Sequence, residues 1–145
     1  MRYVSERINP IGLAKRREIW AMGMRNPWRC RFQTSGKLFC ADVGEHRLEE
    51  IDIIERGGNY GWPYAEGTIC PAGLFSDSSC PSTLNYPAYA YDHAKGSSVT
   101  GGDFGDKTNF PGEYQKRYFF ADYTGGWVKS VLLDGAGAPV PSSLQ

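Results

Sequence analysis

Residues 18–62 read EIWAMGMRNPWRCRFQTSGKLFCADVGEHRLEEIDIIERGGNYGW. They contain short runs in which apolar and polar side chains alternate, and turn residues separate these runs, as is typical of a β-meander. In one run Trp28, Cys30 and Phe32 share a face, and two arginines and a glutamine share the other. This run, residues 28–33, is therefore expected to be a half-buried strand.

Two further strands are expected over residues 37–42 and 50–54, and another before Arg25. The connection Thr-Ser-Gly at 34–36 ends in a glycine that can take the left-handed conformation of a bulged hairpin. If Gln33 pairs with Lys37 across it, the register places Cys30 opposite Cys40 on one face. A cross-strand disulfide is then geometrically possible.

Cys70 and Cys80 have the same ten-residue spacing. The long irregular segment 57–87 contains both cysteines, and a loop of this length is usually functional or disordered. A bridge between the two cysteines would hold this segment in place. Two close cysteine pairs favour a disulfide framework and an oxidising, extracellular or periplasmic location. The alternative is four free thiols in a reducing compartment. The first twenty residues contain no apolar run long enough for a signal peptide or a membrane span, so we expect a fragment of an exported parent.

The remaining patterns also favour strands. They are expected over 86–91, 98–104, 118–123 and 127–133, and no stretch has a useful helical period, so the predicted fold class is all-β. Residues 1–17 are expected to be a leader loop and residues 135–145 a flexible tail, with the folded region over 18–134. The formal net charge is zero, and no basic stripe alternates with aromatic residues, which argues against nucleic-acid binding.

Several segments resemble the glucose/sorbosone dehydrogenase family: EIWAMGMRNPWR, GKLFCADVG, EEIDIIERGGNYGW, SVTGG and YFFADYTGG. The resemblance implies a six-bladed β-propeller, and many members use pyrroloquinoline quinone (PQQ) and calcium. At about 40–50 residues a blade, 145 residues supply two to three blades. The chain is therefore expected to be a fragment or a subunit completed by other copies. RNPWRCRF and the cysteine pattern resemble the branch with hedgehog-interacting-protein-like ectodomains.

The resemblance also implies site residues. Arg25 and Asn26 would contact the quinone, and a guanidinium suits the carboxylates and oxygens of such a cofactor. The alternative is that Arg25 pairs with a nearby carboxylate and ties two blades together. Thr124 falls near the cleft, where PQQ-binding members often have lysine.

A calcium ion would be held by the backbone carbonyls of Gly44 and Glu45, because this hard cation takes oxygen ligands. Many PQQ-using members have proline in place of Glu45, and a plain β-turn is the alternative. His93 lies near the mouth of the cleft in relatives, so it is a candidate substrate contact, with an ordinary surface-loop histidine as the alternative. His46 is expected to be exposed.

Two other motifs are assigned structural roles. Alternation sends Glu50 and Asp52 to one face of their strand, and we expect a solvated strand edge there. Gly57–Trp62 is glycine-rich but lacks the helix of a phosphate-binding loop. Its glycines would permit a tight crossing between blades while Tyr60 and Trp62 pack or line the cleft.

Two functions remain open. The first is a fragment of a secreted PQQ- and calcium-dependent sugar dehydrogenase, which transfers a hydride from C1 of an aldose to the quinone. The second is a non-catalytic extracellular propeller ectodomain that binds a protein or a carbohydrate ligand. No catalytic residue is assigned, because the family's general-base histidine belongs to an earlier blade, and the chain alone is expected to be inactive. Exposed blade edges also suggest self-association.

Overall fold

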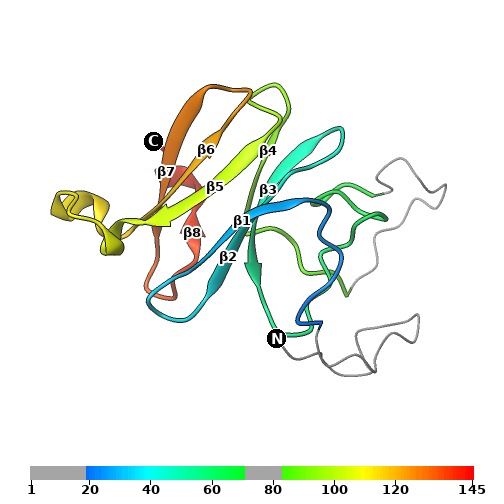
Figure 1. The fold of residues 1–145 in the computed structure, drawn as a ribbon, viewed down its shortest axis with the longest axis horizontal. Helices are drawn as coiled ribbons and strands as arrows, with labels where there is room; N and C mark the ends of the chain where they lie inside the picture. Colours follow the sequence, from blue (N-terminus) through cyan, green and yellow to red (C-terminus); the bar gives the residue numbers. More distant parts are fainter. Residues whose placement is uncertain (1–18, 71–82) are drawn as a thin grey trace.

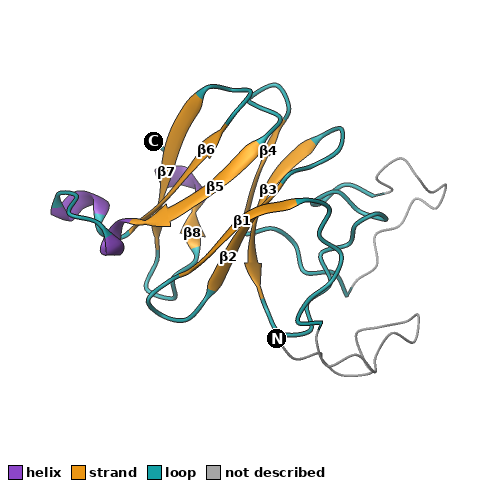
Figure 2. Cartoon of the chain, viewed as in Figure 1, coloured by secondary structure: helices purple, strands orange, loops and turns teal. Residues whose placement is uncertain are grey.

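The computed structural model describes residues 19–70 and 83–145, which form two four-stranded antiparallel sheets packed side by side (Figure 1). The first sheet contains β1 (Pro27–Phe32), β2 (Leu38–Asp42), β3 (Leu48–Ile54) and β4 (Tyr89–Asp92). The second contains β5 (Val99–Phe104), β6 (Arg117–Asp122), β7 (Trp127–Leu133) and β8 (Pro139–Val140). Three short 3₁₀ turns, η1 (Gly105–Lys107), η2 (Gly112–Tyr114) and η3 (Pro141–Ser143), are the helical elements of the described residues (Figure 2). The all-β prediction is confirmed.

The predicted hairpin is present with the predicted register. The Gln33 N–H donates to the Lys37 carbonyl oxygen at 2.8 Å, and Gly36 has a φ of +90°, in the left-handed region. Cys30 pairs with Cys40 across β1 and β2, and the two form a disulfide. The turn chemistry and the alternation therefore placed these two cysteines correctly.

Two expectations about the first strands are wrong. The segment before Arg25 is not a strand, since its only ladder contact within the described residues is an isolated parallel bridge between Met22 and Asn59. Strand β1 is exposed along its whole length rather than half-buried, and Trp28 and Phe32 keep 66% and 58% of their surface accessible. Alternation fixed the apolar face of β1, but the described chain does not cover that face.

The expectation for Glu50 and Asp52 is also wrong, in the opposite sense. Both lie on one face of β3 as predicted, but they are buried, with 6% and 0% of their surface accessible. The reason is that β3 lies inside the sheet, between β2 and β4, and the segment after β3 folds back over this face. Gly67 in that segment lies against the Glu50 carboxylate and hydrogen-bonds to it.

The predicted flexible tail is ordered and completes the second sheet. Pro139 and Val140 form β8, which pairs with the end of β7, so the tail contributes the fourth strand. The backbone groups of Gln145 and Ser130 exchange two hydrogen bonds of 3.0 Å. The tail lacks an apolar pattern because two paired residues and one 3₁₀ turn are too short to show a period.

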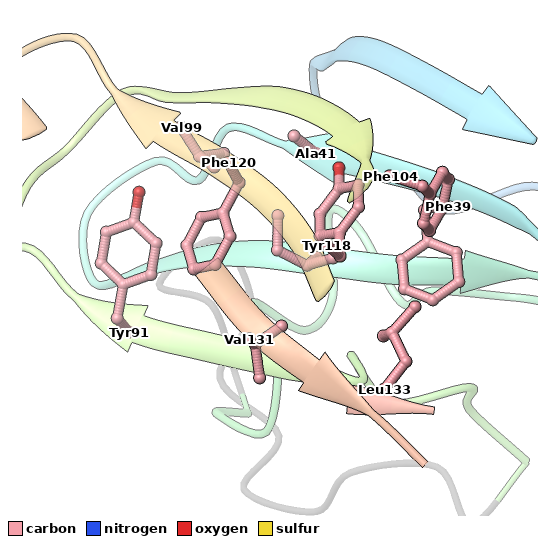
Figure 3. Close-up of a cluster of buried hydrophobic side chains, with 10 residues drawn as sticks. Phe39, Ala41, Tyr91, Val99, Phe104, Tyr118, Phe120, Val131 and Leu133 are labelled. Atoms are coloured by element: carbon pink, nitrogen blue, oxygen red, sulfur yellow. The ribbon is translucent and has the colours of Figure 1, made fainter. Parts of the chain in front are cut away.

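The core lies between the two sheets (Figure 3). Phe39 from β2 is fully buried, and its ring centroid lies 5.1 Å from those of Phe104 in β5 and Tyr118 in β6. The buried members of this cluster are Phe39, Ala41, Ile51, Tyr91, Val99, Phe104, Tyr118, Phe120, Val131 and Leu133. Because they come from both sheets, neither sheet buries its apolar face without the other.

Two sequence predictions lie outside the described residues: the leader loop at 1–17 and the Cys70–Cys80 bridge, because Cys80 falls in the undescribed stretch 71–82. Within the described part of the chain, no helix is long and apolar enough to cross a membrane.

Replacing Phe39 tests the packing between the sheets. The variant Phe39→Ala removes a fully buried ring that contacts the second sheet, and should lower the free energy of unfolding by about 3–5 kcal/mol. The matched control, Phe32→Ala, truncates an exposed ring of the first sheet and should change it by about 0.5 kcal/mol or less. Urea unfolding followed by far-UV circular dichroism measures both, and equal losses would contradict a core between the sheets.

Candidate functional site

The corner before β1 is fixed by one carboxylate. Asp42, at the end of β2, accepts the backbone N–H of Arg25 at 2.8 Å and that of Asn26 at 2.6 Å. The Asn26 carbonyl in turn accepts the N–H of Val43 at 3.1 Å. These bonds hold the backbone of the corner, so neither side chain is needed to keep it in place.

The Arg25 side chain lies along the loop that follows β2. Its Nη1 donates to the carbonyl oxygens of Val43 at 3.1 Å and Gly44 at 2.8 Å, and its Nη2 forms an ion pair with the Glu45 carboxylate. The guanidinium carbon lies 5.5 Å from the centroid of the Trp62 ring, within the range of a cation–π contact. The structure therefore brings Arg25, Gly44 and Glu45 together.

A second carboxylate, which sequence reasoning missed, holds this loop from the other side. Glu66 Oε1 accepts the backbone N–H groups of four consecutive residues, at distances between 2.8 and 3.1 Å: Glu45, His46, Arg47 and Leu48. Burial alone would raise the pKa of Glu66, but these donors outweigh it and lower the pKa below the usual value. Its only sequence signal is that of one acidic residue in an irregular segment.

Gly44 is needed at its position because a side chain does not fit there. A Cβ atom on Gly44 would lie 1.7 Å from the Leu48 carbonyl oxygen and 2.6 Å from Glu66 Oε1. The loop thus closes tightly on itself around the Glu66 carboxylate. His46, in the same loop, is exposed as expected.

His93 lies on the connection from β4 to β5 and is half-buried. Its Nε2 lies 2.9 Å from Glu49 Oε1, and Glu49 Oε2 accepts the Val99 N–H at 2.9 Å. Glu49 is fully buried, and burial raises its pKa despite these partners. His93 therefore links β3 to the second sheet through a buried carboxylate, and it is more than an ordinary surface histidine.

Thr124 lies in the exposed turn between β6 and β7. Its Oγ1 donates to Asp122 Oδ1 at 2.8 Å and accepts the Ser97 N–H at 2.8 Å. Asp122 is itself buried and accepts the Tyr91 hydroxyl at 2.7 Å. Burial would raise the pKa of Asp122, but its several hydrogen bonds lower it below the usual value.

The predicted site residues share one rim of the two sheets. Strand pairing places the end of β2 beside the starts of β1 and β3, and the end of β4 beside the start of β3. The end of β6 lies beside the start of β5 in the same way. Arg25, Gly44 and Glu45 are in mutual contact there. The His93 N–H donates to the Arg47 carbonyl oxygen of the same loop at 3.1 Å, whereas Thr124 bonds to Ser97 and Asp122.

Below this rim lies a cluster of three buried carboxylates. One oxygen from each of Asp42, Glu50 and Asp52 lies within 4.8 Å of the others. Burial, together with the charges of Asp52 and Asp42, raises the pKa of Glu50 to about 9. Burial and the charge of Asp42 likewise raise the pKa of Asp52 well above its usual value.

The residues of the rim can bind an anionic, oxygen-rich cofactor only after the Arg25 side chain changes its position. The Arg25 guanidinium offers the planar donor fork that carboxylates take, but the Glu45 carboxylate already binds to it. The Gly44 carbonyl oxygen, a candidate calcium ligand, accepts a bond from Arg25 Nη1. A cofactor and its calcium would therefore fit these residues once the guanidinium turns from the loop toward the ligand.

Comparisons with known proteins agree with this fold and these residue types. The family model described as Glucose / Sorbosone dehydrogenase matches residues 7–140. Similar curated proteins include the HIPL1 protein of Arabidopsis thaliana, 41% identical over 127 residues that cover 77% of this chain and 18% of the plant protein. Another is quinoprotein glucose dehydrogenase B of Acinetobacter calcoaceticus, 35% identical over 83 residues that cover 57% of this chain and 16% of that protein.

Solved structures show the same architecture. The PQQ-bound aldose sugar dehydrogenase of Streptomyces coelicolor superposes with a TM-score of 0.68 at 21% identity, over 94% of this chain and 34% of that one. The apo aldose sugar dehydrogenase of Escherichia coli gives 0.67 at 25% identity, over 91% and 39%. The chain thus spans less than a fifth of the curated relatives named above and little more than a third of these structures.

Replacing Glu66 tests how the rim loop is held. At pH 7 Glu66→Ala should lower the free energy of unfolding by about 1–3 kcal/mol, because four partly buried N–H bonds lose a charged acceptor. Glu66→Gln keeps a neutral acceptor and should lose less. The folded-state pKa is lowered, so this stabilisation exists above pH 4.5 and disappears as the pH falls through the folded-state pKa.

Urea unfolding of both variants and the parent chain between pH 3 and pH 7 measures this difference. A destabilisation by Glu66→Ala that stays constant as the pH falls would contradict the assigned role, because a purely steric loss does not depend on protonation.

Proposed function

The chain belongs to the glucose/sorbosone dehydrogenase family, and we propose that its two four-stranded sheets, each one blade of a propeller, supply one wall of a PQQ- and calcium-binding site in a sugar dehydrogenase. The observation that carries the proposal is the Arg25 side chain, which donates to the carbonyl oxygens of Val43 and Gly44 and pairs with the Glu45 carboxylate. A cation beside carbonyl oxygens can orient a ligand that has both carboxylates and a bound metal ion.

In this proposal Arg25 and Asn26 bind the cofactor. The guanidinium would take its carboxylates and oxygens, and would stabilise negative charge that develops on it. Asp42 holds the backbone of both residues, so the side chains can turn toward a ligand without moving the corner. When bound, PQQ would accept a hydride from C1 of an aldose.

The remaining rim residues complete this wall. The backbone carbonyls of Gly44 and Glu45 would hold calcium, and their loop is fixed beforehand by Glu66. Thr124 would contact the cofactor through its hydroxyl, and His93 would face the substrate. The family's general-base histidine belongs to an earlier blade, and neither His46 nor His93 matches it, so no histidine of the chain is assigned as the base that takes the sugar's proton. The two blades alone are therefore expected not to turn over substrate.

A second candidate function is a non-catalytic extracellular ectodomain of the same fold, which binds a protein or a carbohydrate. Two observations favour it: the Glu45 carboxylate occupies the Arg25 fork, and Thr124 is uncharged and already hydrogen-bonded to Asp122. The similarity to the HIPL1 protein supports it as well. For either function, the Cys30–Cys40 disulfide supports secretion, and the exposed face of β1 supports association with further blades.

Binding of PQQ and calcium tests the first function. With ligand at a hundredfold its dissociation constant, the folded state should gain about 2.7 kcal/mol, seen as a higher melting temperature. Arg25→Ala should abolish this gain. Arg31→Ala is the matched control, because Arg31 is exposed and pairs with Asp103 away from the rim. No gain in the parent chain, or an equal gain in Arg25→Ala, would contradict the proposed cofactor site.

Releasing Arg25 from its partner separates the two functions. Glu45→Gln removes the charge that competes with a cofactor carboxylate, and should tighten PQQ binding, by up to about tenfold if it removes about 1.4 kcal/mol of competition. The change in tryptophan fluorescence of the chain, that of Trp62 included, as PQQ is added measures the dissociation constant. Binding that is absent in both chains would favour the ectodomain, whereas binding seen only in Glu45→Gln would show that Glu45 blocks the site.

A further inference from the structure

We propose that Glu49 is a positioning residue: it holds His93 in the tautomer that carries its proton on Nε2, and so leaves Nδ1 as an acceptor for a hydroxyl group of the sugar. The inference rests on the proposed function only in placing His93 beside the sugar. The tautomer itself follows from the contacts of Glu49, which are the same whether or not a ligand is bound at the rim.

Glu49 is a carboxylate in the core between the two sheets. Its side chain leaves the same face of β3 as Ile51, a member of the core cluster, and it is fully buried. A charged side chain in such a place needs hydrogen bonds or opposite charges to compensate for its lost hydration. Both oxygens have such a partner: Oε1 lies 2.9 Å from His93 Nε2, and Oε2 accepts the Val99 N–H at 2.9 Å. The carboxylate is therefore fixed at both ends.

His93 lies where this core meets the rim. Its side chain is 24% exposed, and its backbone N–H donates to the Arg47 carbonyl oxygen at 3.1 Å, in the loop that also contains Gly44 and Glu45. Nε2 of the ring is bound to Glu49, whereas Nδ1 has no hydrogen-bond partner among the described residues. Nδ1 is thus the ring nitrogen that is available to a ligand at the rim.

The bond to Glu49 determines which ring nitrogen carries the proton of the neutral imidazole. An ionised carboxylate can only accept, so Nε2 must donate to it and Nδ1 keeps its lone pair. The ordinary pKa of an imidazole exceeds that of a carboxyl group by about two units, which places the shared proton on Nε2. Burial raises the pKa of Glu49, and the charge of Asp122 adds to this rise, so the assignment requires that the rise stays below that difference.

An acceptor at Nδ1 selects a ligand group that can donate. A sugar hydroxyl donates its proton to Nδ1, whereas a carbonyl or ether oxygen has no proton to offer there. Through Val99, the first residue of β5, Glu49 also ties the imidazole to the second sheet. The contact with the sugar is therefore positioned by the packing of the two sheets, and Glu49 acts on the sugar through His93 without touching it.

Nuclear magnetic resonance of the ring nitrogens tests the tautomer. The chain has two histidines, and the exposed His46 is the internal control. At pH 8 the signals of the parent chain should show a proton on Nε2 of His93 and none on Nδ1, while His46 should show a mixture of tautomers. The variant His93→Gln removes one set of signals and so assigns both. A proton on Nδ1 of His93 in the parent chain would overturn the inference.

The variant Glu49→Gln should invert the tautomer. The Val99 N–H still needs an acceptor, so the amide oxygen takes the place of Oε2 and the amide nitrogen that of Oε1. An amide nitrogen only donates, so Nε2 must accept from it and Nδ1 must carry the proton. Glu113→Gln, which alters an exposed carboxylate in η2, is the matched control and should leave the signals of His93 unchanged. An unchanged tautomer in Glu49→Gln would show that Glu49 does not set it.

D-Glucose, added in the presence of PQQ and calcium, tests the contact with the sugar. In the parent chain it should shift the Nδ1 signal of His93 as an accepted hydrogen bond does, and it should not do so in Glu49→Gln, whose Nδ1 already carries a proton. His93→Gln keeps a donor to Glu49 but has no acceptor in place of Nδ1. It should therefore retain the melting temperature of the parent and bind glucose about fivefold more weakly, by the loss of one hydrogen bond.

The outcomes separate this inference from the proposed function. A missing gain in melting temperature with PQQ and calcium counts against the cofactor site and leaves the tautomer of His93 unaffected. Equal glucose binding in the parent chain and His93→Gln would overturn the inference. So would His93 signals that do not respond to glucose, whether or not PQQ binds.

Discussion

Buried carboxylates that accept backbone N–H groups hold the connections at one rim of the two sheets. Connections between strands have N–H groups that no ladder satisfies, and each must find an acceptor when it is buried. Asp42 supplies one for the corner before β1, Glu66 for the loop before β3, and Asp122 for the turns of the second sheet. The positions of Arg25, Asn26, the Gly44–Glu45 loop and Thr124 depend on these bonds, because the loops that contain them have no regular structure of their own, and His93 is held in the same way by the buried carboxylate of Glu49.

Sequence reasoning recovered what local rules determine. Turn chemistry and alternation gave the β1–β2 register, the Cys30–Cys40 disulfide and the β7 strand with its observed bounds. It failed where the answer depends on contacts between distant segments. Alternation says which residues share a face but not whether another segment covers that face. Trp28 was therefore expected to be half-buried and is exposed, while Asp52 was expected to be solvated and is buried.

In the candidate site, too, the sequence indicated some of the residues and missed those that depend on contacts between distant segments. The resemblance directed attention to Arg25, Gly44 and Glu45, and the structure places them in contact. Nothing in the sequence indicated Glu66, since a carboxylate that binds backbone amides can come from any segment that reaches them. The two possible roles of Arg25 also depend on geometry: its fork is directed at a carboxylate of its own loop, and a ligand must compete with that carboxylate.

The same competition would allow one rim to serve either proposed function. A guanidinium bound by Glu45 is a structural element of the loop, and the same group released from Glu45 would be free to bind an external anion. The difference in free energy between these arrangements combines one partly exposed ion pair, which contributes little in water, with the bonds from Arg25 Nη1 to the carbonyl oxygens of Val43 and Gly44. A change of a single charge at position 45 can therefore shift the balance, provided that Asp42 keeps the backbone of the corner fixed in both states. The two N–H groups that Asp42 accepts consequently limit how the rim can respond to a ligand.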